Sequence, residues 1–237
     1  MDACGPGLQP VDHATGSKGR NSRTPVNTTT ADATRRHPRL LVTTFLSLLA
    51  PAGAWFVIRS ALPYFDMSPE HYGPYFWPRR WGLMLHIAGG TIALIVGLVQ
   101  LWLGLTHRVA AAHRALGKLY VGAIGVASIG GFYLALTIHG NPPYGTGLFM
   151  LCVAWVITTS MAVFAIRRRN VTQHREWMLR SYAVTFAFVT FRFGVDALVQ
   201  WRGLQPGEAQ AIMAWACWVA PLVLLEPLLQ LRKVRGR

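Results

Sequence analysis

The chain has 237 residues, of which 52% are hydrophobic and only 14% are charged, and its formal net charge is +14 at pH 7. Soluble globular domains are typically about one quarter charged. This composition excludes an ordinary soluble domain. It predicts an integral membrane protein in which most residues belong to membrane-spanning segments.

The first 38 residues differ in composition from the rest of the chain. They are rich in Ser, Thr, Gly, Pro and Arg and show no apolar periodicity, so they cannot bury enough apolar surface to fold. We expect residues 1–38 to form a disordered, basic, cytoplasmic tail. Residues 39–232 are expected to form a six-helix transmembrane domain, and residues 233–237 a basic cytoplasmic end.

Six apolar stretches follow the tail, and each is long enough to cross a bilayer as a helix. An apolar core of about 30 Å requires about 20 helical residues, and the runs lack the strict alternation of barrel strands. The first run also resembles a secretory signal, because Ala50, Pro51 and Ala52 suit a cleavage site, but we favour an uncleaved helix. We expect an all-α polytopic membrane bundle with spans at residues 40–58, 82–104, 115–138, 147–166, 181–200 and 210–231.

Residues 59–81, between the first two spans, interleave Tyr, Phe and Trp with Pro. Amphipathic aromatic rings are favoured at the depth of the lipid headgroups. We interpret this stretch as a segment that lies at the membrane interface, and the alternative is a lid over an outer pocket.

The second span carries small residues along one helical face, together with an imidazole and an amide. Small residues let helix backbones approach closely in lipid, where no hydrophobic drive brings helices together. The alternative interpretation is room for a flat cofactor beside the imidazole. The residues that share this face are His86, Gly90, Ala93, Gly97, Gln100 and Gly104.

Four histidines fall at two matched depths on different helices. His113 and His174 lie at the predicted inner ends of the third and fifth spans, while His86 and His139 lie near the outer ends of the second and third. Bis-histidine ligation of haem requires two imidazoles at one depth. The pattern predicts His113 and His174 as ligands of a haem iron, with His86 and His139 as a second candidate pair. The alternative is contact with lipid phosphates.

Arginines near these histidines are candidates to bind haem propionates by charge-assisted hydrogen bonds. Arg180 lies at the inner end and Arg192 lies further along the fifth span. Arg192 is also four residues from Asp196, on one helical stripe with Ser181 and Thr185. We expect Arg192 and Asp196 to form an intramembrane ion pair that faces other helices, as is typical of a transporter or a proton relay.

Lysine and arginine are distributed unevenly along the chain. Most of the 23 basic residues fall in the tail, in two alternate loops and at the C-terminal end, whereas the other loops hold only Arg59, Arg79, Arg80 and Arg202. By the positive-inside rule this bias places both termini in the cytoplasm. The net charge is then explained by topology and by anionic lipid at the inner face, so no nucleic-acid partner is implied.

A resemblance to a known family rests on three blocks of sequence: HIAGGTIALIVGLVQL, HRALGKLYVGAIGVASIGGFYLAL and QHREWMLRSYAVTFAFVTFRF. These blocks resemble a family of bacterial multi-pass membrane proteins called domain of unknown function 2306, over residues 82–200. The resemblance implies the fold and a place in the bacterial cytoplasmic membrane, but no activity. The residues that carry it are His113, Gly117, Tyr120, His174, Arg180 and Tyr182.

The second block is also similar to a helix of cytochrome b561. The core of that family has four helices and holds two haems through histidines of paired helices, the second with the fourth and the third with the fifth. The resemblance implies that His113 and His174 form the latter pair. The fourth span has no histidine, so only His139 or Met150 could complete a site with His86.

Three functional hypotheses follow from these patterns. The first is an electron-transfer protein that binds haem b through His113 and His174. The second is a transporter or proton-relay protein built around Arg192 and Asp196, and the third is a structural membrane subunit with no catalytic role. The sequence assigns neither a catalytic residue nor a protein partner.

Overall fold

The computed structural model describes residue 44, residues 46–106 and residues 110–235. These residues belong to one compact unit, Leu41–Arg237, and the predicted tail of residues 1–38 lies outside them. Residues 46–56 are α-helical. The elements that follow are a π-helix Val57–Ala61, a 3-10 helix Leu62–Asp66, α2 (Pro69–Phe76), a 3-10 helix Trp77–Arg79, α3 (Arg80–Thr106), α4 (Ala110–Leu136), α5 (Pro142–Arg167), α6 (Val171–Arg202) and α7 (Pro206–Arg235).

The expectation of an all-α protein with six spans is confirmed. Within the described residues, six helices are long and apolar enough to cross a membrane. The predicted boundaries differ from the observed ones at the first, second and fifth spans, and the second candidate span begins at Pro69 instead of residue 82. The first candidate span runs to Asp66 instead of ending at residue 58, and α6 begins at Val171, ten residues before the predicted start.

Helix α6 begins early because its start is capped. The side chain of Asn170 accepts a hydrogen bond from the backbone N–H of Gln173 at 3.0 Å, which satisfies one of the free amides of the first turn. Arg169 has a left-handed backbone with φ 58°, so the chain reverses within three residues between α5 and α6. As a result, the polar first turns of α6 fold back against α5.

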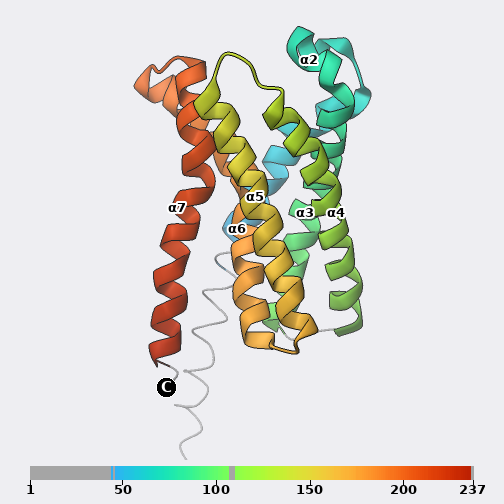
Figure 1. Cartoon of the computed structure of the whole chain (residues 1–237), viewed down its shortest axis with the longest axis vertical. Helices are drawn as coiled ribbons and strands as arrows, with labels where there is room; N and C mark the ends of the chain where they lie inside the picture. The colour runs from blue at the N-terminus through green and yellow to red at the C-terminus, as the bar shows by residue number, and fades with distance from the viewer. Residues whose placement is uncertain (1–43, 45, 107–109, 236–237) are drawn as a thin grey trace, which may run out of the picture. The chain divides into compact units, whose positions relative to one another are not determined.

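Helices α3–α7 run along one another in a bundle (Figure 1). The most extensive contact joins α3 to α4, and α6 contacts α5, α7 and α3. The α3–α4 contact depends on glycine: a Cβ at Gly89 would lie 2.6 Å from the carbonyl oxygen of Ala123 and 2.8 Å from the amide nitrogen of Ala127. The two helix backbones therefore touch, which is the role that small residues have in membrane helices.

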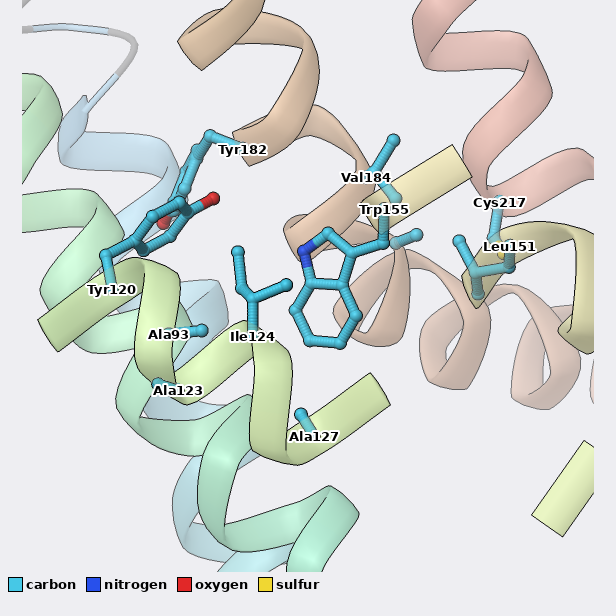
Figure 2. Packing of buried hydrophobic residues seen from close by; sticks show 11 residues of the cluster. Ala93, Tyr120, Ala123, Ile124, Ala127, Leu151, Trp155, Tyr182, Val184 and Cys217 are labelled. Carbon is cyan, nitrogen blue, oxygen red and sulfur yellow. The ribbon is translucent and has the colours of Figure 1, made fainter. Parts of the chain in front are cut away.

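The core of the bundle is centred on Trp155 of α5, which is fully buried. Its neighbours in the buried cluster include Ile124 of α4 and Val184 of α6, while Tyr120 and Tyr182 lie on one side of the cluster (Figure 2). A Cβ at Gly97 would lie 2.6 Å from the Tyr182 ring. The space that Gly97 leaves on the small-residue face of α3 is thus occupied by an aromatic ring.

Residues 57–81 form a small aromatic layer at the end of the bundle where α2 lies (Figure 1). Tyr72 is buried there, packs edge-on against Tyr64 and Trp77, and donates its hydroxyl to the Tyr64 carbonyl at 3.0 Å. Arg79 donates to the Thr137 carbonyl at 3.0 Å, which ties the layer to the end of α4. We call this the α2 end, and the opposite end, where α7 finishes, the C-terminal end.

Candidate functional site

A network of buried hydroxyl groups joins α4, α5 and α6 near the middle of the bundle. The Tyr120 hydroxyl is hydrogen-bonded to Ser181 Oγ at 2.9 Å and to Thr185 Oγ1 at 2.8 Å. Trp155 Nε1 donates to Thr185 Oγ1 at 2.8 Å, and Thr159 Oγ1 is 2.8 Å from Ser181 Oγ. Every member is buried and has a partner, so the network fixes the relative position of three helices.

The network also fixes the two histidines of the C-terminal end. His113 precedes Tyr120 by seven residues and His174 precedes Ser181 by seven, so each histidine lies two turns before its partner on the same helical face. Both helices start at the C-terminal end (Figure 1). The two imidazoles therefore lie at one depth of the bundle.

The hydrogen bonds of the two imidazoles differ. His174 Nδ1 is 2.9 Å from the carbonyl oxygen of Ala162. Because a carbonyl only accepts, Nδ1 donates this bond, and in the neutral imidazole Nε2 then keeps its lone pair. His113 Nδ1 is buried and has no hydrogen-bond partner among the described residues. Metal-binding histidines commonly donate their second nitrogen to a backbone carbonyl, as His174 does.

Two residues of α3 line the same site. Gln100 is 4% exposed and donates Nε2 to the His113 carbonyl at 2.6 Å, but its Oε1 has no partner in the described part of the chain. A Cβ at Gly104 would lie 3.5 Å from His113 Cε1, and the Gly104 carbonyl accepts a hydrogen bond from Arg175 at 3.4 Å. The site thus contains two unpartnered polar atoms beside a guanidinium group, and native proteins rarely leave such atoms unpaired.

Arg180, a predicted propionate partner, is occupied by an ion pair between α6 and α7. Its Nη2 lies 2.5 Å from Glu226 Oε2, and its side chain is 14% exposed. Lys233 Nζ lies 2.8 Å from Glu176 Oε2, and Gln230 donates to Glu226 Oε1 at 2.6 Å. The two ion pairs fasten α7 to the first turns of α6, while the Gln230 bond lies within α7 and orients Glu226. Arg180 would have to leave Glu226 to bind a propionate.

The second pair of histidines is not brought together. His86 Nδ1 donates to the Ala127 carbonyl at 2.9 Å, and its ring packs edge-on against Phe188 at 4.9 Å. His139 is exposed in the loop after α4, and the Met150 side chain is also exposed. The cavity beside His86 has a volume of about 70 Å³, whereas cofactor pockets measure about 300–1,000 Å³. The residues around His86 therefore do not fit a haem.

Arg192 and Asp196 lie on the surface of the bundle instead of between helices. Arg192 Nε is 4.0 Å from Asp196 Oδ2, and the two side chains are 56% and 44% exposed. Ser181 and Thr185, on the same helical stripe, are fully buried. The expectation that the whole stripe faces other helices is wrong for this part of α6, because the neighbouring helices do not cover it.

The sequence pattern missed Trp155, Thr159 and the partner of Arg180. Trp155 and Thr159 lie four residues apart on the face of α5 that meets the predicted Ser181 stripe. The four-residue spacing of Trp155 and Thr159 was the feature of the sequence from which their shared polar face could have been predicted. No spacing in the sequence links Arg180 to Glu226, since they are 46 residues apart.

Taken together, the fold and the site define a multi-pass membrane protein whose helix bundle holds a polar site with two histidines at one end. The chain belongs to the family described as predicted membrane protein (DUF2306), whose family model matches residues 83–229, more than half of the chain. No curated protein and no solved structure shows a significant match to the chain.

Proposed function

We propose that this protein is a b-type haem electron carrier in which His113 and His174 are the two protein ligands of the iron. The observation that carries the proposal is the placement of the two imidazoles, at one depth on α4 and α6, two turns from a rigid hydroxyl network. Because both helices start at this end and both offsets are seven residues, the imidazoles face a common space.

The number of ligands favours haem over a bare metal ion. Protein zinc sites use three or four side-chain ligands, and the described residues contain no group of three or more His, Cys, Asp or Glu side chains that could hold a metal. A haem needs only axial ligands from the protein, since the macrocycle supplies the others. Two imidazoles are therefore a sufficient set for haem.

The unpartnered atoms of the site support a bound group in this position. His113 Nδ1 and Gln100 Oε1 are both buried without a partner, which is costly unless a ligand or water uses them. The Ala162 carbonyl holds the His174 ring with Nε2 free to bind. Arg175, beside Gly104, is placed to bind a propionate by a charge-assisted hydrogen bond.

When bound, a haem supplies one-electron redox chemistry. The chain's own part is to hold the two imidazoles, to exclude water with the Tyr120, Ser181 and Thr185 network, and to position a guanidinium at the rim. The rival transporter function loses its main support, because the Arg192–Asp196 pair is exposed and 4.0 Å long. The described structure offers no observation that favours a purely structural role.

The haem proposal is tested by absorbance spectra of the purified full-length protein, produced with haem supplied, before and after reduction by dithionite. We expect a Soret band and a sharp α band on reduction. His113→Ala and His174→Ala should each abolish both bands while the protein still inserts in the membrane. His139→Ala is the matched control and should keep them, because His139 lies in an exposed loop at the other end. A flat visible spectrum of the unmodified protein, or full haem content in both variants, would remove the proposal.

We also propose that the C-terminal end of the bundle faces the cytoplasm of a bacterium, with both termini inside. The support is the clustering of basic residues at this end, where α5 meets α6 through Arg167, Arg168 and Arg169. A fluorescent protein fused after residue 237 should fluoresce, and an alkaline phosphatase fused there should be inactive. The same phosphatase inserted at Gly140, in the loop at the α2 end, should be active. An active phosphatase at the C-terminus would reverse the orientation.

A further inference from the structure

A groove with a volume of about 500 Å³ opens between α4 and α5 at the C-terminal end. Its lining includes Val121 of α4 and Ser160, Phe164 and Arg167 of α5. This groove is separate from the histidine site, because Val121 follows Tyr120 and so points about 100° away from the hydroxyl network. Thr159 contributes the floor, where it is hydrogen-bonded to Ser181.

The two helices are tightly packed toward their other end. Near the α2 end, a Cβ at Gly131 would lie 2.8 Å from Cys152 Sγ, and Phe132 packs against Phe149 with ring centres 5.2 Å apart. A Cβ at Gly145 would also lie 3.4 Å from the Ala135 carbonyl. Toward the C-terminal end, side chains line an open groove in place of such contacts.

The open end of the groove is strongly basic. Arg114, Lys118 and Val121 are spaced four and three residues apart, so the two cations share the face of α4 that lines the groove. Arg167 lines the groove from α5. No carboxylate among the described residues pairs with Arg114, Lys118 or Arg167. Three cations at one end of an apolar groove therefore lack a counter-charge from the described part of the chain.

We propose that the α4–α5 groove binds one anionic phospholipid of the surrounding membrane. An acyl chain lies against Val121, Met161 and Phe164, and the phosphate is bound by Arg167 together with Lys118 and Arg114. The combination of an apolar channel and a basic end matches an amphiphile with a negative head, as basic pockets between membrane helices do.

This proposal does not depend on haem binding, since the groove shares only its floor residue, Thr159, with the hydroxyl network, and none of the variants below changes that residue. It goes beyond general attraction of a basic surface to anionic lipid, because it assigns both the headgroup contacts and the place of the chain. Two kinds of variant separate these parts. Lys118→Gln with Arg167→Gln removes charge and leaves the groove open, whereas Ser160→Trp fills the groove and leaves the charges.

Native mass spectrometry of the full-length protein in detergent measures the affinity for each lipid. The probes are phosphatidylglycerol and phosphatidylcholine with identical acyl chains. We expect the unmodified protein to bind phosphatidylglycerol more tightly. Lys118→Gln with Arg167→Gln should weaken this binding by about tenfold or more, given about 1 kcal/mol per basic residue, with little change for phosphatidylcholine. The control Arg59→Gln with Arg202→Gln removes two charges from the α2 end and should change neither affinity.

The groove-filling variant tests the place of the acyl chain. Ser160→Trp should weaken binding of both lipids, and Ser160→Ala should leave both unchanged. All of these positions are at least partly exposed, and thermal melting of each variant in detergent verifies its fold. Equal affinity of the unmodified protein for the two lipids, unchanged phosphatidylglycerol binding in the double charge variant, or unchanged binding in Ser160→Trp would each overturn the proposal.

Discussion

Trp155→Ala is expected to lower the free energy of unfolding by about 3–5 kcal/mol, the range for removal of a large buried aromatic side chain. Trp155 is completely buried, and it lies in contact with α4 and α6 at the centre of the buried cluster (Figure 2). Its loss leaves a cavity where three helices meet. It also removes the N–H that donates to Thr185 Oγ1 at 2.8 Å.

Two further variants separate packing from hydrogen bonding at this position. Trp155→Phe keeps a phenyl ring and loses the donor and part of the indole volume, so it should cost clearly less than the alanine variant. Trp201→Ala removes the same side chain from a position that is 82% exposed and should leave the melting temperature nearly unchanged. Thermal melting in one detergent compares all three. Equal losses for Trp155→Ala and Trp201→Ala would contradict the assignment of Trp155 to the core.

The sequence predicted the six spans because long apolar runs admit few other structures in a bilayer. It predicted their ends poorly, because hydropathy does not mark where a helix begins. Helix α6 starts at the Asn170 cap, and its first turns carry charged side chains that an apolar window excludes. The first span likewise continues through a π-helix, Val57–Ala61, into the region whose aromatic and proline residues predicted a segment at the membrane interface.

The predicted polar stripe of α6 was correct at one part and wrong at another for a physical reason. Ser181 and Arg192 are eleven residues apart and share one helical face, yet Ser181 is fully buried and Arg192 is exposed. Helical periodicity shows which side chains share a face. It does not show how far along the helix a neighbouring helix covers that face, which depends on how the helices cross.

The two unpartnered atoms of the histidine site lay beyond sequence reasoning altogether. Gln100 was visible as a polar member of the small stripe of α3, but its bond to the His113 carbonyl and its free Oε1 depend on the α3–α4 register. The direct contact between the two helix backbones that helps to set this register is made by a glycine outside the stripe. Gly89 meets the backbone of α4, while the adjacent Gly90 of the stripe meets nothing within 4 Å.

Gly89→Ala is therefore expected to destabilise the protein, and Gly90→Ala is its matched control one residue away. A Cβ at Gly89 would lie 2.6 Å from the Ala123 carbonyl and 2.8 Å from the Ala127 nitrogen. Backbone atoms cannot rotate aside as a flexible side chain can, so α3 and α4 must separate. We expect a loss of about 1–3 kcal/mol in the free energy of unfolding, as for other overpacked positions.

Gly90→Ala should instead leave the free energy of unfolding unchanged or raise it by up to about 1 kcal/mol, the intrinsic preference of a helix for alanine over glycine. Both variants add the same methyl group to the same helix, so helix propensity cancels in the comparison. Thermal melting in detergent gives the difference between them. If Gly89→Ala melts at or above the temperature of Gly90→Ala, the two backbones are not in contact at Gly89. The α3–α4 register that places Gln100 against His113 would then be wrong.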